Sequence, residues 1–155
     1  MIESIAAIFS SLSSATSTAE AFKKLLRGKK GDTKAFLEEV KENLGLCWMV
    51  VERDTDPMNI IRELATLEYD RLLRAGFNFN SLSRKKIQGN PGLAESDLSS
   101  FIGKETEDLV ENIYDKIKTL KRIHRVDKGN PRIRWRRRIV NVQKRMLLLM
   151  EHLRS

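Results

Sequence analysis

Apolar residues recur along the chain at intervals of three and four positions, which is the period of one face of an α-helix. The last such stretch contains Trp135, Ile139, Val142, Met146, Leu149 and Leu153. No stretch shows the alternation of apolar and polar residues that is typical of a β-strand. We therefore predict an all-α fold, an antiparallel bundle of about five helices in one domain, 1–155, with helices over 2–27, 33–53, 57–75, 98–127 and 131–154.

Turn-forming residues mark the ends of these helices. Pro57 follows two aspartates and favours a helix start, whereas Gly76 favours a helix stop. Residues 76–97 contain dense turn chemistry and are expected to form an irregular connection. Gly129-Asn130-Pro131 indicates a short turn, so the last two helices should form an antiparallel hairpin over 98–154.

Two tryptophans and the single cysteine fall on apolar helix faces, and we interpret Trp48, Trp135 and Cys47 as core residues. One cysteine excludes an intramolecular disulfide framework and a site with several cysteine ligands. The sequence holds two histidines and lacks a glycine-rich phosphate loop, a serine nucleophile elbow and an Asp-rich metal loop. We therefore predict neither a bound metal nor a cofactor.

The positive charge of the chain is concentrated near its C-terminal end. The formal net charge is +8 over 155 residues, but residues 1–115 carry −4 and residues 116–155 carry +12. Part of this gradient is typical of a helix dipole, because the predicted helix 98–127 has acidic early turns and basic late turns. The remaining excess indicates a polyanionic partner, a membrane surface or an acidic protein.

Five arginines lie within seven residues directly after Pro131. Arginine binds phosphate through two parallel hydrogen bonds and also stacks on bases, so this cluster favours RNA or DNA. We predict a non-enzymatic helical interaction protein that binds a polyanion through the C-terminal hairpin. The candidate residues are Arg132, Arg134, Arg136, Arg137 and Arg138, supported by Lys121, Arg122 and Arg125.

A catalytic alternative depends on Arg145 and His152, which lie seven positions apart on the last predicted helix. Their spacing resembles the Arg-x(4–6)-His pattern of the HEPN ribonuclease superfamily, although Met146 stands where a polar residue often follows the arginine. The resemblance implies a small all-α domain that cleaves RNA without a metal at a dimer cleft. In such a site histidine moves protons and arginine stabilises developing negative charge.

A third alternative is an adaptor or effector-like protein that binds an acidic protein or a membrane surface. Residues 147–150 widen the apolar face of the last helix, which indicates deep burial or a homodimer seam between helices. No run approaches 18 uninterrupted apolar residues, so no transmembrane segment is predicted. The N-terminal segment lacks the pattern of a secretory signal, and we expect a cytoplasmic location.

Overall fold

The computed structural model describes residues 2–155, with side chains described from Ile5 onward. Within this part of the chain all regular elements are helical and no strand is present, which confirms the predicted all-α fold. The α-helices are α1 (Ile2–Ile8), α2 (Ala15–Leu26), α3 (Gly31–Arg53), α4 (Pro57–Glu63), α5 (Leu67–Arg74), α6 (Pro91–Ala94), α7 (Thr106–Asp127) and α8 (Trp135–Arg154). Short 3-10 helices are η1 (Ser10–Leu12), η2 (Phe79–Leu82) and η3 (Ser99–Phe101).

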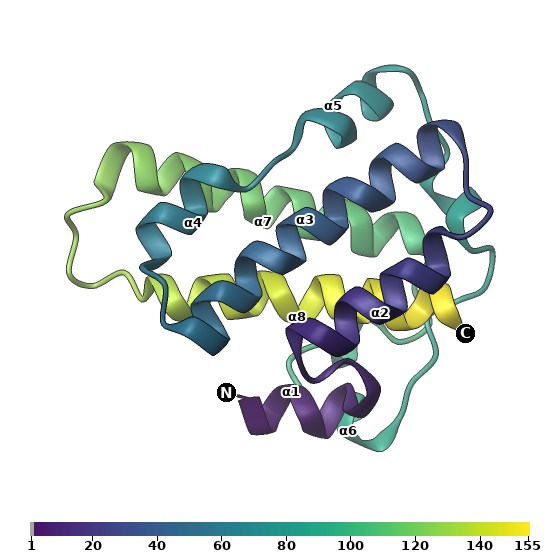
Figure 1. Ribbon diagram of the computed structural model, residues 1–155, viewed down its shortest axis with the longest axis horizontal. Coiled ribbons are helices and arrows are strands. Elements are labelled where there is room, and N and C mark those ends of the chain that lie inside the picture. Colours follow the sequence, from purple (N-terminus) through teal and green to yellow (C-terminus); the bar gives the residue numbers. More distant parts are fainter. Residues whose placement is uncertain (1) are drawn as a thin grey trace.

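Three long helices form the framework of the fold. Both α3 and α7 pack against α8, and α7 and α8 run antiparallel to each other (Figure 1). The shorter helices cover this framework: α2 lies on α3, while α4 contacts α3, α7 and α8. Helix α8 is therefore central, because its apolar stripe is wide enough to meet neighbours on several sides.

The helix predicted over 57–75 is wrong as a single helix, because the chain breaks between α4 and α5. The side chain of Asn43, from α3, is fully buried and stabilises this break. Its amide nitrogen donates to Ala65 O and its amide oxygen accepts from Ala65 N, both at 2.8 Å. These bonds satisfy backbone groups that a continuous helix would have paired internally.

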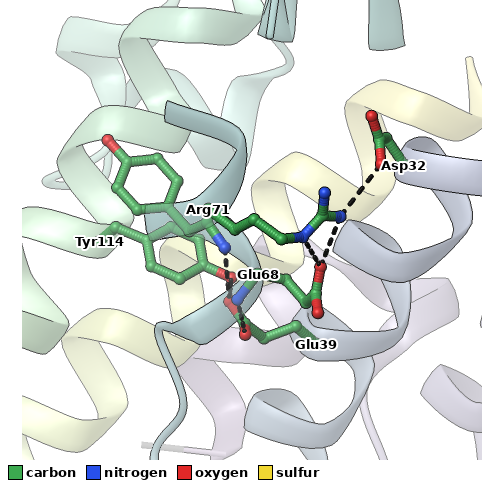
Figure 2. Close-up of polar contacts among 6 residues, drawn as sticks. Asp32, Glu39, Glu68, Arg71 and Tyr114 are labelled. Atoms are coloured by element: carbon green, nitrogen blue, oxygen red, sulfur yellow. Dashed lines mark hydrogen bonds and ion pairs between the residues drawn. The ribbon is translucent and has the colours of Figure 1, made fainter. Parts of the chain in front are cut away.

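Glu39 on α3 holds the start of α5. Its carboxylate accepts hydrogen bonds from the backbone N–H of Glu68 at 2.7 Å and of Tyr69 at 3.2 Å, and from the Tyr114 hydroxyl at 2.9 Å. Figure 2 shows this buried cluster beside an exposed one, in which Arg71 pairs with Glu68 and Asp32. A carboxylate at a helix N-terminus satisfies unpaired N–H groups and complements the helix dipole.

The prediction of a single helix over 2–27 is also wrong, because the α-helix is interrupted at residues 9–14. The side chain of Ser14 accepts from Ser17 N at 3.0 Å, and the side chain of Ser17 accepts from Ser14 N at 3.1 Å. This capping box starts α2 afresh. Serine side chains compete with the backbone for hydrogen bonds, and here that competition ends one helix and begins the next.

The last two helices begin later than predicted. Helix α7 begins at Thr106, eight residues after the predicted start at 98, because Glu105 and Asp108 form a capping box there. Ile102, which lies within the predicted helix 98–127, is 37% exposed and precedes α7. Helix α8 begins at Trp135 rather than at residue 131, so the connection between α7 and α8 is longer than the predicted turn.

The irregular connection predicted over 76–97 carries η2 and α6. Within it Ile87 pairs with the segment before α7: Ile87 N donates to Lys104 O at 2.9 Å, and Gly103 N donates to Ile87 O at 2.8 Å. The connection is therefore tied to the framework by backbone hydrogen bonds as well as by its buried apolar side chains.

The apolar residues singled out in the sequence lie mostly in the core. Cys47 is fully buried, and burial raises the pKa of its thiol to about 12. Trp48 is buried and donates to Thr18 Oγ1 at 3.1 Å, whereas Trp135 is half-buried at the edge of the core. The broad apolar segment Leu147–Met150 is buried within this one chain. Among residues 2–155, none of the helices combines the length and the apolar character needed to cross a membrane.

Gly92 allows α6 to pack directly on α1. A Cβ atom at this position would lie 2.4 Å from the carbonyl oxygen of Ala7, a contact that only a backbone shift could relieve. We expect Gly92→Ala to lower the free energy of unfolding by about 1–3 kcal/mol, as measured by urea denaturation.

Gly45 offers the matched control, because it lies inside α3 and a Cβ atom at this position would have no neighbour within 4 Å. Gly45→Ala should stabilise the protein by up to about 1 kcal/mol, since alanine is the better helix former. An equal effect of both substitutions would contradict the proposed close contact of α6 with α1.

Candidate polyanion-binding surface

Four exposed arginines surround a hollow at the start of α8. The hollow has a volume of about 390 Å³, and its lining contains no carboxylate. Within the described part of the chain, no hydrogen bond or ion pair engages any of these four guanidinium groups. The lining residues are Arg132, Arg134, Arg137, Arg138 and Asn141.

The helix dipole opposes this concentration of positive charge. A helix N-terminus carries a partial positive charge and is stabilised by acidic residues, not by basic ones. The first turn of α8 nevertheless contains no acidic residue, and the N-cap residue, Arg134, makes no side-chain capping hydrogen bond. The arginines therefore do not stabilise the start of α8 electrostatically, and an anion at this hollow would relieve their mutual repulsion.

A second hollow, of about 270 Å³, adjoins the first between α7 and α8. The two linings share Arg138 and Asn141, and the second also includes Lys116 and Asn112 from α7, together with one carboxylate, Asp115. We call the two hollows together the arginine groove. Its walls offer guanidinium, ammonium and amide donors along a continuous path from the α7–α8 connection into the helix pair.

Lys116, in the lining of the groove, is affected both by burial and by the cations around it. Burial lowers the pKa of Lys116, and the nearby Arg145 and Arg138 lower it further. Arg145 does not line the groove but bonds two residues that do: its Nε donates to Asn112 Oδ1 at 3.0 Å and its Nη1 donates to the backbone oxygen of Asn141 at 2.8 Å. The bond from Arg145 fixes the orientation of the Asn112 side-chain amide in the groove lining.

Two of the eight cations predicted for this surface are instead engaged within the fold. Arg136 Nη1 donates to Val50 O at 2.8 Å and to Asp54 Oδ1 at 3.0 Å, so it caps the C-terminal end of α3. Lys121 Nζ donates to Leu64 O at 2.6 Å and to two further carbonyls at the end of α4. Cations at helix C-termini satisfy unpaired carbonyl groups, and the structure gives these two side chains that role.

The remaining α7 candidates lie apart from the arginine groove. Arg125 lines a different hollow, of about 380 Å³, together with Arg62, His124 and Lys128, and this lining shares no residue with the groove. Burial lowers the pKa of His124, with a further contribution from the cations around it. Arg122 is exposed. These residues occupy the C-terminal turns of α7, where the helix dipole favours cations.

Arg145 and His152, the predicted catalytic pair, contact different parts of α7. Arg145 binds Asn112, whereas His152 Nε2 lies 2.8 Å from Thr106 Oγ1, near the start of α7. His152 is 4% exposed and lines a separate hollow that shares no residue with the arginine groove. No hydrogen bond joins the two side chains within the described part of the chain.

Sequence reasoning did not identify Lys116, Asn112 or Asn141 as part of this surface. Lys116 stands among the many cations of the last 40 residues, and no pattern distinguishes it from its neighbours. The two asparagines lie on different helices, and their importance comes from bonding the same guanidinium group. The sequence could have indicated that these two asparagines lie close together only through a heptad-style alignment of the two predicted hairpin helices.

His152 makes stability depend on pH. Burial and the nearby Lys85 lower the pKa of His152 below the ordinary value of 6.5, so the unfolded chain binds this proton more readily. The resulting stabilisation is complete above pH 6.5 and is lost as the pH falls through the lowered pKa, by at most about 1.4 kcal/mol per pH unit. Urea denaturation at pH 7.5 and 5.5 should show this loss, and the loss should be smaller in His152→Gln. A loss that is unchanged in His152→Gln but reduced in His124→Gln would assign it to the other histidine.

Comparison with known proteins gives no assignment for this surface: no family model, curated protein or solved structure matches the chain.

Proposed function

We propose that this protein is a non-enzymatic nucleic-acid-binding protein, acting in the cytoplasm, that holds a phosphodiester backbone in the arginine groove. The single observation that carries the proposal is the group of four exposed guanidiniums around one hollow at the start of α8, none of which has a partner among the residues whose side chains the structure describes. Their position opposes the helix dipole, so a structural role for their charge is not apparent.

Recognition is expected to depend on phosphate rather than on base sequence. Arginine forks and oriented amide donors bind phosphate oxygens, and such contacts carry no direct sequence information. Trp135, the aromatic side chain next to the cluster, is half-buried and meets His124 edge-on at a centroid distance of 6.0 Å. It is therefore not presented as a flat platform for a base, which favours backbone binding over stacking.

Salt dependence tests this proposal. We expect a fluorescently labelled oligonucleotide to bind with a log–log slope of affinity against salt of about −3 to −4, the value for four or five neutralised phosphates. Single- and double-stranded DNA and RNA of mixed sequence should be compared by fluorescence anisotropy. A slope near zero, or the absence of binding at low salt, would refute the proposal.

The same samples test the catalytic alternative. RNA incubated with the protein in EDTA should remain intact on a denaturing gel, because the structure separates His152 from the groove. Metal-independent cleavage that disappears in His152→Ala would instead support a ribonuclease, and the function would then need to be reassigned.

A further inference from the structure

The two halves of the arginine groove differ in their chemistry. The hollow at the start of α8 is lined by four arginines and one asparagine, whereas the hollow between α7 and α8 also contains Asp115. Asp115 is exposed, and its carboxylate has no hydrogen-bond or ion-pair partner in the described part of the chain. A carboxylate repels a phosphate and can only accept hydrogen bonds, so Asp115 suits a different chemical group of the ligand.

The side-chain amide of Asn112 lines the same hollow, three residues before Asp115 on α7. The Nε atom of Arg145 can only donate a hydrogen bond, so the atom of Asn112 that lies 3.0 Å from it is the amide oxygen. The amide nitrogen, Nδ2, is therefore left to donate elsewhere. It has no acceptor in the described part of the chain, and it is not among the buried unpaired atoms of that part, so solvent reaches it.

A donor and an acceptor thus lie next to each other on one face of α7. Residues three apart on an α-helix are neighbours, with Cβ atoms about 5–6 Å apart, so two short polar side chains at these positions can both reach one small group of a ligand. That group must accept a hydrogen bond from Asn112 and donate one to Asp115. A phosphodiester oxygen only accepts, whereas a hydroxyl group does both.

We propose that this hollow binds the 2′-hydroxyl of a ribose, so that the arginine groove selects RNA over DNA; this selectivity rests on the nucleic-acid function proposed above. The hydroxyl accepts from Asn112 Nδ2 and donates to the Asp115 carboxylate. Arg138, which lines both hollows, binds a phosphate of the same strand. The 2′-hydroxyl is a donor and an acceptor, and it is the group by which a protein distinguishes RNA from DNA.

Three single-stranded 12-mers that differ only in the sugar test this selectivity by fluorescence anisotropy at 0.1 M salt. They contain only adenine and cytosine, so their bases are identical, and they carry ribose, deoxyribose or 2′-fluororibose. Fluorine preserves the sugar shape of RNA but removes the hydroxyl hydrogen. We expect RNA to bind about tenfold more tightly than either other strand, the usual effect of one charge-assisted hydrogen bond. Equal affinity for RNA and its 2′-fluoro analogue would overturn the proposal.

Two alanine variants of α7 separate the contact of Asp115 from its effect on net charge. Asp115→Ala should reduce the ratio of RNA affinity to DNA affinity from about ten to about one. Glu111→Ala removes the same charge one turn earlier on α7. Glu111 is exposed and lies outside the groove lining, so this variant should keep the wild-type ratio. An RNA preference that survives in Asp115→Ala, or that Glu111→Ala abolishes as well, would contradict the assigned contact.

The same titrations distinguish failure of the sugar contact from failure of the nucleic-acid function. If RNA and DNA bind equally tightly with the salt slope given above, the groove holds a phosphodiester backbone and the contact with the 2′-hydroxyl is refuted. If no strand binds at low salt, the nucleic-acid function is refuted, and the selectivity for RNA is refuted with it.

Discussion

Replacing four arginines by glutamine at once is expected to weaken oligonucleotide binding about a thousandfold at 0.1 M salt. The substituted residues are Arg132, Arg134, Arg137 and Arg138, which line the hollow at the start of α8. Each neutralised phosphate adds about 0.7–0.9 to the salt slope, and this electrostatic gain vanishes near 1 M salt. Four lost contacts therefore remove about three powers of ten at 0.1 M, and anisotropy titrations at several salt concentrations measure both quantities.

A second quadruple variant controls for the change in net charge. Lys23, Lys24, Lys29 and Lys30 are all exposed and lie at the end of α2 and in the connection that follows it, at the opposite end of the molecule from the start of α8 (Figure 1). Changing them to glutamine removes the same four charges but should alter affinity less than tenfold, since long-range charge effects are screened beyond about 10 Å. Equal losses of affinity in the two variants would show that binding depends only on net charge, which would contradict binding at the arginine groove.

Arg136 separates folding from binding within the same cluster. Its guanidinium is engaged with Val50 O and Asp54 at the end of α3, unlike that of Arg137 next to it. Arg136→Gln should therefore lower the free energy of unfolding by about 1–2 kcal/mol with little effect on the salt slope. Arg137→Gln should do the reverse, lowering the slope by about one without destabilising the fold.

Glu39→Ala is expected to lower the free energy of unfolding by about 3–4 kcal/mol. The substitution removes a buried carboxylate that accepts three hydrogen bonds, from Glu68 N, Tyr69 N and the Tyr114 hydroxyl. It leaves a buried hydroxyl and the start of α5 unpaired, and each lost bond to a charged acceptor costs about 1.5–3 kcal/mol before relaxation. Urea denaturation followed by circular dichroism measures this change.

Neighbouring substitutions indicate whether the carboxylate acts as described. Glu38→Ala removes the adjacent, exposed glutamate, whose partner Lys34 is 4.0 Å away, and should cost less than about 0.5 kcal/mol. Tyr114→Phe should cost about 1–2 kcal/mol, because it removes only one of the three donors to Glu39. A small effect of Glu39→Ala, comparable to that of Glu38→Ala, would contradict the role assigned to the buried cluster.

The helical framework was predictable because its signals are local. The 3,4 spacing of apolar residues identifies the faces of α3, α7 and α8, and those faces are buried. The breaks after α1 and α4 were not predictable from the sequence. The first depends on the hydrogen bonds that the side chains of two serines make to the backbone. The second depends on Asn43, which lies 22 residues from the Ala65 it binds. Such contacts leave no periodic trace in the sequence.

The candidate surface was predictable only in part, for the same reason. Clustering in the sequence identified the arginines after Pro131, but it could not distinguish Arg136 from its neighbours. The side chain of Arg136 meets the end of α3, which is more than 80 residues away along the chain. Lys116 has no distinguishing pattern and joins the groove because α7 and α8 pack together.

The sequence by itself determined the all-α class, the long amphipathic helices and the concentration of positive charge near the end of the chain. These properties follow from residue type and spacing, which are local quantities. Only the tertiary structure decided which cations cap helices and which have no partner in the described part of the chain, and it also placed Arg145 and His152 in separate surroundings. A side chain's available hydrogen bonds depend on the groups that folding brings to it, and those groups come from distant parts of the chain.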